Sequence, residues 1–326
     1  MDIDLPSGRY VVAVSGGVDS VVLLHILLQQ CNIPQASTHG SQKNLAPQTA
    51  SPTKAAAQNP KPSIQLTVAH FDHGIRADSI KDRQLVQKLA QAHNLPFVYD
   101  RAELGAGASE ATARKARYEF LAKVQAAVGA DAILTAHHED DVLETIIINW
   151  MRGTKSRGLS SLRSGQQLRR PLLGVPKKRI RAYAQAHKLT WREDSTNQDE
   201  TYLRNYIRKH VVGKLDAAAR GQLLEHSAKA AELNDAIHSL VDEYLQHHTS
   251  AHEIDRLAYR ELPKEVAREV LAEWLRRYTD ASISTKLILR LDNAIRTARS
   301  GTQIDIAHGQ HFVISRATAT KTANDQ

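Results

Sequence analysis

The sequence predicts an α/β protein, in which a parallel-sheet domain is followed by a smaller, mainly helical domain that ends in a β-hairpin. In the N-terminal part, short β-branched runs alternate with segments of helical length and pattern, as in "RYVVAV" followed by "VVLLHILLQQ". Repeated strand–helix units of this kind build a parallel sheet with helices on both faces. After about residue 215 the pattern becomes helical, and only "TQIDIAHGQHFVISR" alternates like two strands around a turn.

Four strand–helix units account for the first domain. Strands are expected at residues 9–14, 64–70, 97–100 and 132–136, because each run is short and rich in β-branched or other apolar residues. Helices are expected at residues 21–30, about 78–93, 109–128 and about 140–151. In an open parallel sheet, ligands bind beyond the carboxyl ends of the strands. The polar segments that follow the strands are therefore the candidate site.

Changes in composition indicate how the chain is divided. We predict domains over residues 1–214 and 215–326, the second built from helical segments and closed by a β-ribbon. Residues 35–63 interrupt the first domain with four prolines and almost no large apolar side chain. Such a segment cannot bury enough apolar surface to offset the entropy of ordering, so we predict that it is a disordered insertion.

Composition also excludes several classes of protein. No run approaches the roughly 20 apolar residues of a membrane span, and the N-terminus lacks the basic and apolar regions of a secretion signal. Cys31 is the single cysteine, which excludes a disulfide framework or a cysteine-built metal site within one chain. We therefore expect a cytoplasmic protein that does not bind membranes. The sequence does not fix the oligomeric state and is compatible with a homodimer.

Positive charge is concentrated in one stretch of the chain. The formal net charge is +8, and residues 152–192 hold twelve Lys or Arg side chains with no Asp or Glu among them. Such a run can be a solvated face, or phosphates can relieve its self-repulsion. We predict that it forms part of a nucleic-acid-binding surface, with exposed contacts at Lys155, Arg157, Lys177 and Lys178. Arg170, which precedes a proline in "RRPLL", is expected to be structural.

The hexapeptide "SGGVDS", Ser15–Ser20, is the most informative motif. It links the first strand to the first helix, where glycines let backbone N–H groups converge at the helix N-terminus and form an anion site. Asp19 would repel a phosphate unless a divalent cation bridged them, so this carboxylate implies Mg²⁺. A tight turn with an ordinary helix cap is the alternative. Neither the dinucleotide fingerprint nor the Walker motif is present.

Other polar segments lie at the ends of later strands and on the third helix. "AHFDHGIR" follows the second strand, and "TAHHEDDVLET" ends the fourth strand and begins its helix. The acids of this last segment could also be simple complements of the helix dipole. "EATARKARY" sets Glu110, Arg114 and Arg117 on one helical face, a pattern that a surface ion-pair ladder would share. Arg204 and Arg208, in "YLRNYIR", are one helical turn apart and would face the same ligand.

"SGGVDS" in this setting resembles the pyrophosphate-loop (PP-loop) motif of the ATP pyrophosphatases, whose fold is adenine nucleotide α-hydrolase-like. From Tyr10 to about Val212, the motifs taken in order resemble the tRNA(Ile)-lysidine synthetase family. That family uses ATP to attach L-lysine to carbon 2 of the wobble cytidine of tRNA(Ile) with a CAU anticodon, through an adenylated cytidine, and releases AMP and pyrophosphate. The insertion at 35–63 is a departure from the family's common core. We also expect that the chain lacks the further C-terminal domain of longer members and binds tRNA without it.

The resemblance implies a role for each candidate residue. ATP would be bound by the PP-loop residues Ser15, Gly16, Gly17, Val18, Asp19 and Ser20, by Arg117, and by His70 and His73 beside the base. Arg114, Arg204 and Arg208 would contact the triphosphate or the transition state, and Asp19 and Asp141 would bind Mg²⁺. The ammonium group of lysine needs carboxylates, for which Glu110, Glu139, Asp140 and Glu144 are the candidates. One acid must also accept a proton, since only the neutral amine is a nucleophile.

Three alternatives compete with this interpretation. A tRNA 2-thiolation enzyme of the same superfamily would act on the same carbon of cytidine, but such enzymes carry sulfur or a cluster on paired cysteines, and Cys31 has no partner. An ammonia-using synthetase would need an ammonia source, and no cysteine nucleophile is placed to supply it. A basic RNA-binding protein that keeps an ATP-binding fold without catalysis is the third alternative, which an ATP–pyrophosphate exchange assay would separate from an enzyme.

Overall fold

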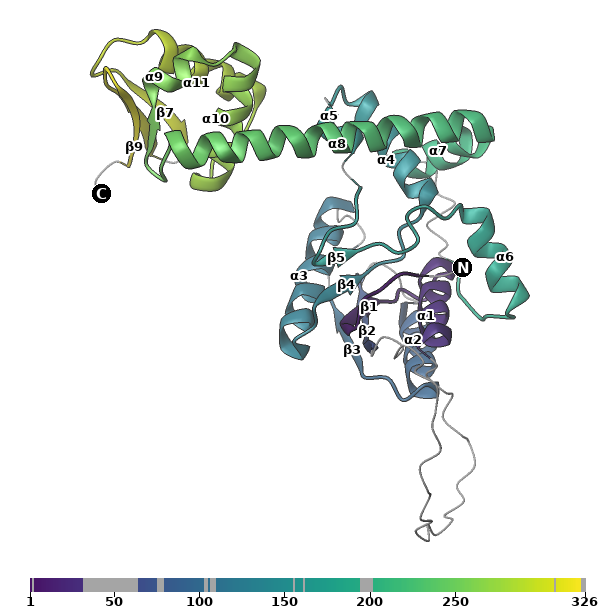
Figure 1. The fold of residues 1–326 in the computed structure, drawn as a ribbon. Coiled ribbons are helices and arrows are strands. Elements are labelled where there is room, and N and C mark those ends of the chain that lie inside the picture. Colours follow the sequence, from purple (N-terminus) through teal and green to yellow (C-terminus); the bar gives the residue numbers. More distant parts are fainter. Residues whose placement is uncertain are drawn as a thin grey trace, which may run out of the picture. The chain divides into compact units, whose positions relative to one another are not determined.

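The computed structural model describes residues 1, 3–31, 64–74, 79–102, 105, 110–154, 156–160, 162–193, 202–307 and 309–323. These residues form two compact units, Met1–Ala228 and Lys229–Gln326. The division falls within one helix, α8 (Ala217–His248) (Figure 1). The predicted insertion at 35–63 lies outside the described residues.

The first unit contains a five-stranded parallel sheet. Its strands are β1 (Gly8–Ala13), β2 (Ile64–Asp72), β3 (Phe97–Arg101), β4 (Ala132–Leu134) and β5 (Leu168–Arg169), in the order β3-β2-β1-β4-β5. Every neighbouring pair is parallel. The four predicted strands are confirmed. The short strand β5 was not predicted, because two residues carry no periodic pattern.

The first unit contains the four expected helices and further helices that follow them. They are α1 (Val18–Gln30), α2 (Ser79–Ala92), α3 (Glu110–Val128), α4 (Glu139–Met151), α5 (Ser156–Leu159), α6 (Lys177–Ala186) and α7 (Leu203–His210), with the 3₁₀ turn Val212–Lys214 before α8. The four helices expected between residues 21 and 151 are all present. The α/β class with a parallel sheet is therefore confirmed.

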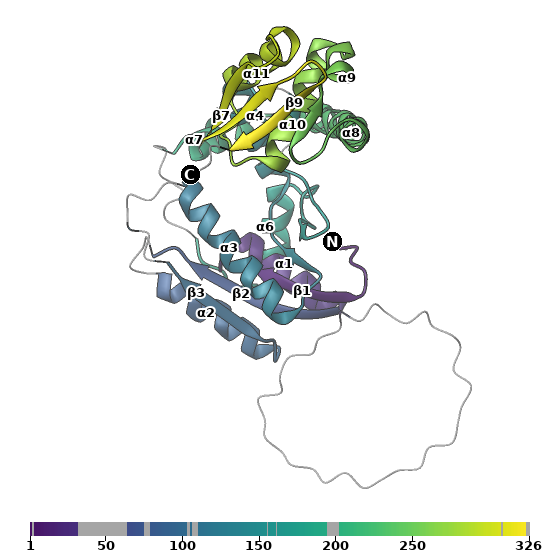
Figure 2. The same cartoon turned by 90° about the vertical axis from the view of Figure 1, so that its left-hand side faces the viewer.

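Both faces of the sheet are covered by helices (Figures 1 and 2). On one face, Tyr10, Val12 and Val14 share a core with side chains of α1, α2 and α6. On the other face, Val11 and its neighbours on β2 and β4 pack against Phe120, Leu121 and Val124 of α3. Alternate residues of β1 thus point into different cores, which is why this strand has no polar face.

The strand order places a crevice beside β1. The chain moves outward from β1 to β2 and β3, and returns to the other side of β1 with β4. Two loops therefore leave the carboxyl ends of the neighbouring strands β1 and β4 at the point where the strand order reverses. Ligands of open α/β sheets bind at such points.

The second unit combines helices with an antiparallel sheet. The helices α9 (Arg256–Glu261), α10 (Lys264–Tyr278) and α11 (Thr285–Thr297) accompany β6 (Glu253–Asp255), β7 (Gln303–Ala307), β8 (Gln310–Ile314) and β9 (Thr318–Ala323). The sheet order is β6-β9-β8-β7. The predicted hairpin is β7–β8, and β9 and β6 extend it. β9 is rich in Thr and Ala, so its sequence carries only a weak strand pattern.

The buried side chain of Arg256 links three backbone carbonyl groups of the second unit. The Arg256 guanidinium donates to the carbonyl oxygens of Ile295, Ser315 and Ala298, at 2.5 to 2.6 Å. Two of these carbonyls, those of Ile295 and Ala298, belong to the C-terminal end of α11, whose last carbonyls have no partner within the helix. In the described part of the chain, none of the helices is long and apolar enough to cross a membrane.

Candidate active site

The predicted anion-binding loop joins β1 to α1. Gly16 has a φ of +93°, a conformation that favours glycine, and Gly17 is the N-cap of α1. The loop is held by its own hydroxyls, since Ser20 Oγ donates to the Gly17 carbonyl (2.9 Å) and accepts from the Ser15 N–H (3.1 Å). No side chain caps α1. The N–H groups of its first turn can therefore bind an anion.

Arg192 supports the loop from a distant part of the chain. Its backbone N–H donates to the Gly16 carbonyl at 3.0 Å, and its Nε donates to Asp82 Oδ1 of α2 at 2.5 Å. Asp82 in turn lies against Gly16, where an added Cβ would be 3.5 Å from the Asp82 Cβ. Arg192 is one of the twelve cations of the basic stretch, and its partner here is this internal acid.

Asp19 and Asp141, the predicted magnesium ligands, converge on one histidine. His138 Nε2 lies 3.7 Å from Asp19 Oδ2 and 3.5 Å from Asp141 Oδ2. The three side chains come from the first turn of α1 and the start of α4, which follow the neighbouring strands β1 and β4. Sequence reasoning placed the two acids at adjacent strand ends but assigned no role to His138.

Asp141 is held in its ionised form. Burial would raise the pKa of this carboxyl, but the charge of His138, the backbone N–H of His138, 2.9 Å from Oδ2, and the charge of Arg208 hold it below its usual value. An ionised carboxylate at this position can bind a cation. In the described residues, no group of three or more His, Cys, Asp or Glu side chains is placed to hold a metal ion. Mg²⁺ is usually held by one or two carboxylates together with substrate phosphates, and Asp19 and Asp141 fit that arrangement.

Lys177 lies beside Asp19, and the expectation that it is exposed is wrong. Its Nζ is 2.6 Å from each carboxylate oxygen of Asp19, and its side chain is 29% exposed. Lys177 begins α6, and its backbone N–H donates to Asp140 Oδ1 at 3.1 Å. Lys178, the next residue, is exposed as predicted.

Arg204 and Arg208 face the same partner, as predicted, and that partner is Glu144. This carboxylate is completely buried. It accepts from Arg204 Nε at 3.0 Å, and from Arg208 Nε and Nη2 at 2.6 and 3.0 Å. Arg208 Nη2 also lies 3.7 Å from Asp141 Oδ1. Glu144 therefore fixes α7 on α4 and holds both guanidinium groups beside the helix turn that carries Asp141.

Glu139 and Asp140 share a cation that sequence reasoning missed. Arg220 of α8 donates to Glu139 Oε1 at 2.9 Å and to Asp140 Oδ1 at 2.7 Å. The second oxygen of each carboxylate accepts no hydrogen bond from the described residues. These two acids can therefore bind a further cation without losing Arg220. No sequence signal could link Arg220 to acids eighty positions earlier.

Arginines gather around His137, next to the same helix start. Arg117 Nε is buried and has no hydrogen-bond partner among the described residues, and burial lowers the pKa of this guanidinium. Burial lowers the pKa of His137 to about 3, with the charges of Arg117, Arg170 and Arg114 acting in the same direction against Asp141. The histidine is therefore neutral at physiological pH. The positive charge around it belongs to the arginines, which can bind an anion.

The histidines of the second strand take different positions. His70 is buried, and its Nδ1 donates to the carbonyl of Val14, at the end of β1, at 2.8 Å. Its Nε2 is buried with no hydrogen-bond partner among the described residues. The His73 ring lies edge-on to Phe71, with ring centroids 5.0 Å apart. Both histidines are at the carboxyl end of β2, where a base pocket was predicted.

Three candidate side chains lie outside the described part of the structure. Lys155 is not described, and for Arg157 and Glu110 only the backbone is, in α5 and at the start of α3. Their predicted contacts to tRNA and lysine stay predictions. Arg170, expected to be structural, donates from its guanidinium to the carbonyl oxygen of Arg163.

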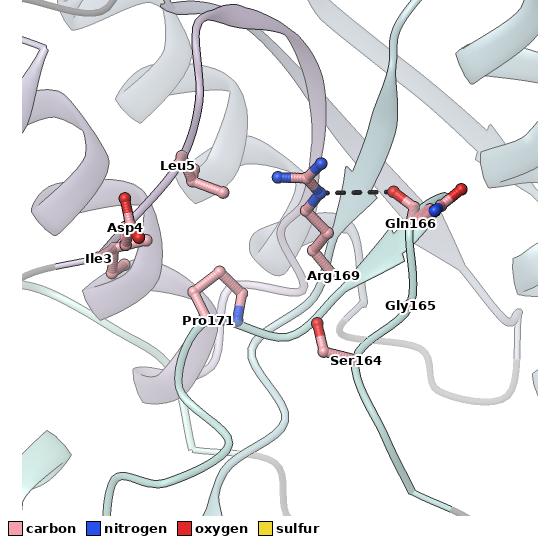
Figure 3. Close-up of a pocket in the computed structure, with 8 residues that line it drawn as sticks. All are labelled: Ile3, Asp4, Leu5, Ser164, Gly165, Gln166, Arg169 and Pro171. Carbon is pink, nitrogen blue, oxygen red and sulfur yellow. Dashed lines mark hydrogen bonds between the residues drawn. The ribbon is translucent and has the colours of Figure 1, made fainter. Parts of the chain in front are cut away.

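A separate cavity of about 590 Å³ lies at the amino ends of β1 and β5 (Figure 3). It is lined by Ile3, Asp4, Leu5, Ser164, Gly165, Gln166, Arg169 and Pro171. Arg169 Nε donates to the Gln166 carbonyl at 3.4 Å, as the dashed line shows. The PP-loop hexapeptide follows the opposite, carboxyl end of β1. The cavity therefore does not belong to the candidate active site.

A family model described as a PP-loop domain matches residues 3–215. The chain belongs to the PP-loop family. The matched range includes every candidate residue of the crevice except Arg220. It ends close to the predicted domain boundary at residue 215.

Curated relatives of this PP-loop protein are named tRNA(Ile)-lysidine synthase. The relative from Geobacter sulfurreducens is 34% identical over 256 residues, which cover 74% of this chain and 48% of the relative. The relative from Thermosynechococcus vestitus is 29% identical over 323 residues, which cover 94% and 85%. The PP-loop protein spans less than half the length of the first three such relatives.

A solved structure shares the fold of this PP-loop protein. It is the U34-tRNA thiolase NcsA from Methanococcus maripaludis with its 4Fe-4S cluster, which matches with a TM-score of 0.50 at 15% identity. The match covers 70% of this chain and 73% of that one. The likeness shows the PP-loop fold alone.

The lowered pKa of His137 predicts an acid-sensitive fold for this PP-loop protein. The unfolded chain binds a proton near pH 6.5, whereas folded His137 does so only near pH 3. Its contribution to stability is therefore complete above pH 6.5 and is lost as the pH falls toward 3. Between pH 7 and pH 5, the protonation of His137 in the unfolded chain lowers the free energy of unfolding by at most about 2 kcal/mol. Urea unfolding of the wild type and of His137→Gln should show a shallower pH dependence for the variant, and equal slopes would contradict the assignment.

Proposed function

We propose that the protein is a cytoplasmic tRNA(Ile)-lysidine synthetase, active as a monomer or homodimer. It would join L-lysine to carbon 2 of the wobble cytidine of tRNA(Ile) with a CAU anticodon, converting ATP to AMP and pyrophosphate. The observation that carries the proposal is the convergence of the PP-loop acid Asp19 with Asp141 on His138, next to the arginines around His137. The choice of tRNA(Ile) as the molecule that receives lysine rests on the names of the curated relatives.

In the first step, the oxygen on carbon 2 of cytosine attacks the α-phosphate of ATP, and the bond to the β-phosphate breaks. The N–H groups at the start of α1 and the loop hydroxyls of Ser15 and Ser20 would bind the departing pyrophosphate. Arg114 and Arg117 would stabilise charge on the triphosphate. Asp19 and Asp141 would hold Mg²⁺, which, when bound, neutralises charge that develops on the phosphates. His70 and His73 would lie beside the base.

In the second step, the neutral ε-amine of lysine attacks carbon 2, and AMP leaves with the oxygen. Before attack, the lysine ammonium needs carboxylates. Glu139 and Asp140 each keep an oxygen without a donor from the described residues, whereas both oxygens of Glu144 accept hydrogen bonds from Arg204 or Arg208. We therefore favour Glu139 and Asp140 for the ammonium group, with Glu110 as a further candidate. Glu144 would act mainly by positioning Arg204 and Arg208 toward the transition state.

The exposed cations of the basic stretch are expected to bind tRNA. Changing Arg152, Lys178 and Arg179 together to alanine should raise the Michaelis constant for tRNA and flatten the slope of log affinity against log salt by up to about one unit per lost phosphate contact. These three side chains are exposed. The Michaelis constants for ATP and lysine should barely change. Steady-state kinetics over a salt series measures both effects.

A matched control separates tRNA binding from a general effect of charge. Lys115 and Lys123 are exposed cations on α3, outside the basic stretch. Their double alanine variant should keep the wild-type salt slope. Equal slopes for the wild type and the triple variant would show that Arg152, Lys178 and Arg179 belong to a solvated face, which was the alternative for this stretch.

The whole activity is tested by incubation with ATP, labelled L-lysine and tRNA(Ile), followed by nucleoside analysis. Lysidine in the product confirms the proposal. Sulfur incorporation would instead indicate a 2-thiolation enzyme, which the single cysteine of this chain disfavours. No ATP–pyrophosphate exchange with any tRNA, from a folded protein, would indicate an RNA-binding protein without catalysis.

A further inference from the structure

The PP-loop of this protein has no cation of its own. "SGGVDS" contains one acid and no Lys or Arg, whereas the Walker motif ends in a phosphate-binding lysine. Departure of pyrophosphate leaves negative charge on the β-phosphate oxygen, and a fixed positive charge at that point lowers the barrier. A side-chain cation that acts on this oxygen would therefore come from another part of the chain.

Lys177 occupies the required position. Its Nζ lies 2.6 Å from both Asp19 oxygens, although the two residues are 158 positions apart in sequence. Asp19 is in the first turn of α1, directly after the N-cap Gly17 and Val18. The ammonium group is therefore at the helix end where the loop presents its N–H groups to an anion.

The placement of Lys177 does not depend on the ion pair alone. Ile180 and Ala184 of α6 are buried in the same core as the apolar side chains of α1. The Lys177 N–H is also bound to Asp140 Oδ1 at 3.1 Å. The backbone of Lys177 is thus fixed beside the loop, while its four-carbon side chain can turn from a carboxylate to a phosphate oxygen.

We propose that Lys177 binds the β- and γ-phosphates of ATP, and this rests on the proposed use of ATP by the loop. When the nucleotide and its divalent cation bind Asp19, the ammonium group transfers its hydrogen bonds to phosphate oxygens. As the bond between the α-phosphorus and the bridging oxygen breaks, the electron pair stays on pyrophosphate. Lys177 remains protonated and stabilises that charge. It therefore acts on the leaving group and not on tRNA.

Calorimetric titration of the full chain with ATP and with AMP tests this role. Lys177→Met should weaken ATP binding by about tenfold or more, because one charge-assisted contact is lost. Binding of AMP, which lacks both outer phosphates, should change less than about twofold. Lys177→Arg should recover most of the ATP affinity. Lys123→Met, at an exposed cation on α3 outside the basic stretch, should bind both nucleotides like the wild type.

Each other outcome overturns the assignment. Equal losses for ATP and AMP would indicate that Lys177 only supports the loop, and unchanged ATP affinity would indicate that it does not reach the phosphates. Tighter ATP binding by Lys177→Met would mean that the ammonium group merely competes with the ligand for Asp19. If the methionine variant fails to fold, Lys177→Gln is titrated in its place. A wild type that binds ATP but makes no lysidine refutes the proposed function alone, and one that binds no ATP refutes both proposals.

Discussion

Replacing Asp19 by alanine is expected to abolish adenylation while leaving the first unit folded. The side chain projects from the first turn of α1 and is about a quarter exposed, at 27%, so its removal leaves no cavity in the core. The change removes one of two proposed Mg²⁺ ligands, and a bound metal stabilises transition-state charge by several kcal/mol. The adenylation rate should fall by at least about 10³-fold. ATP–pyrophosphate exchange at saturating Mg²⁺ measures the loss.

Two further variants sharpen this prediction. Asp141→Ala should lose adenylation to the same extent, with an added loss of about 1 kcal/mol in unfolding free energy, because its carboxylate accepts the His138 N–H at the start of α4. Asp100→Ala is the matched control, since this exposed acid also lies near the carboxyl end of its strand, β3. It should keep wild-type turnover. Near-normal exchange by Asp19→Ala would refute its assignment as a metal ligand.

Replacing Glu144 by glutamine is expected to damage both stability and activity. The carboxylate is fully buried between Arg204 and Arg208, so its neutralisation removes a counter-ion from both guanidinium groups. Removing one partner of a buried ion pair costs about 3 kcal/mol or more. The melting temperature of the first unit should fall by roughly 6 to 12 °C. Adenylation should fall by about 10²-fold, because both arginines lose the contact that orients them.

The control for Glu144 is an exposed acid in an ordinary helix pair. Glu119 faces Lys115 one turn earlier on α3 at 3.8 Å, with both side chains largely exposed. Glu119→Gln should change the unfolding free energy by less than about 0.5 kcal/mol. Thermal unfolding followed by circular dichroism compares the two variants with the wild type. A melting temperature of Glu144→Gln equal to that of Glu119→Gln would show that the buried pair does not hold α7 on α4.

Local pattern in the sequence was enough to predict the first sheet and its anion site. The strands β1, β2, β3 and β4 are short apolar runs. Because both faces of β1 are buried, its run of apolar residues can be recognised from the sequence alone, whichever strands lie beside it. The loop was recognised because glycines, hydroxyls and a helix start must be adjacent in sequence to form such a site. The predicted meeting of Asp19 and Asp141 followed from the rule that parallel strands present their carboxyl ends at one edge.

Patterns were insufficient where the element was short or its side chains small. β5 has two residues, and β9 has no large apolar side chain, so neither resembles the apolar runs that predict strands. Both strands form because a neighbouring strand offers unpaired backbone groups. Only the folded chain shows that such an edge is available.

By itself, the sequence determined the α/β order, the PP-loop and the excess of positive charge. Only the tertiary structure decided which charged side chains form ion pairs with one another. Lys177 and Arg192 belong to a stretch without acids, yet each lies against an acid far away in sequence, Asp19 and Asp82. The physical reason is that an ion pair needs proximity in space, which depends on the helix that covers each face of the sheet. The type of a residue fixes its charge, whereas the fold fixes the residue with which it forms an ion pair.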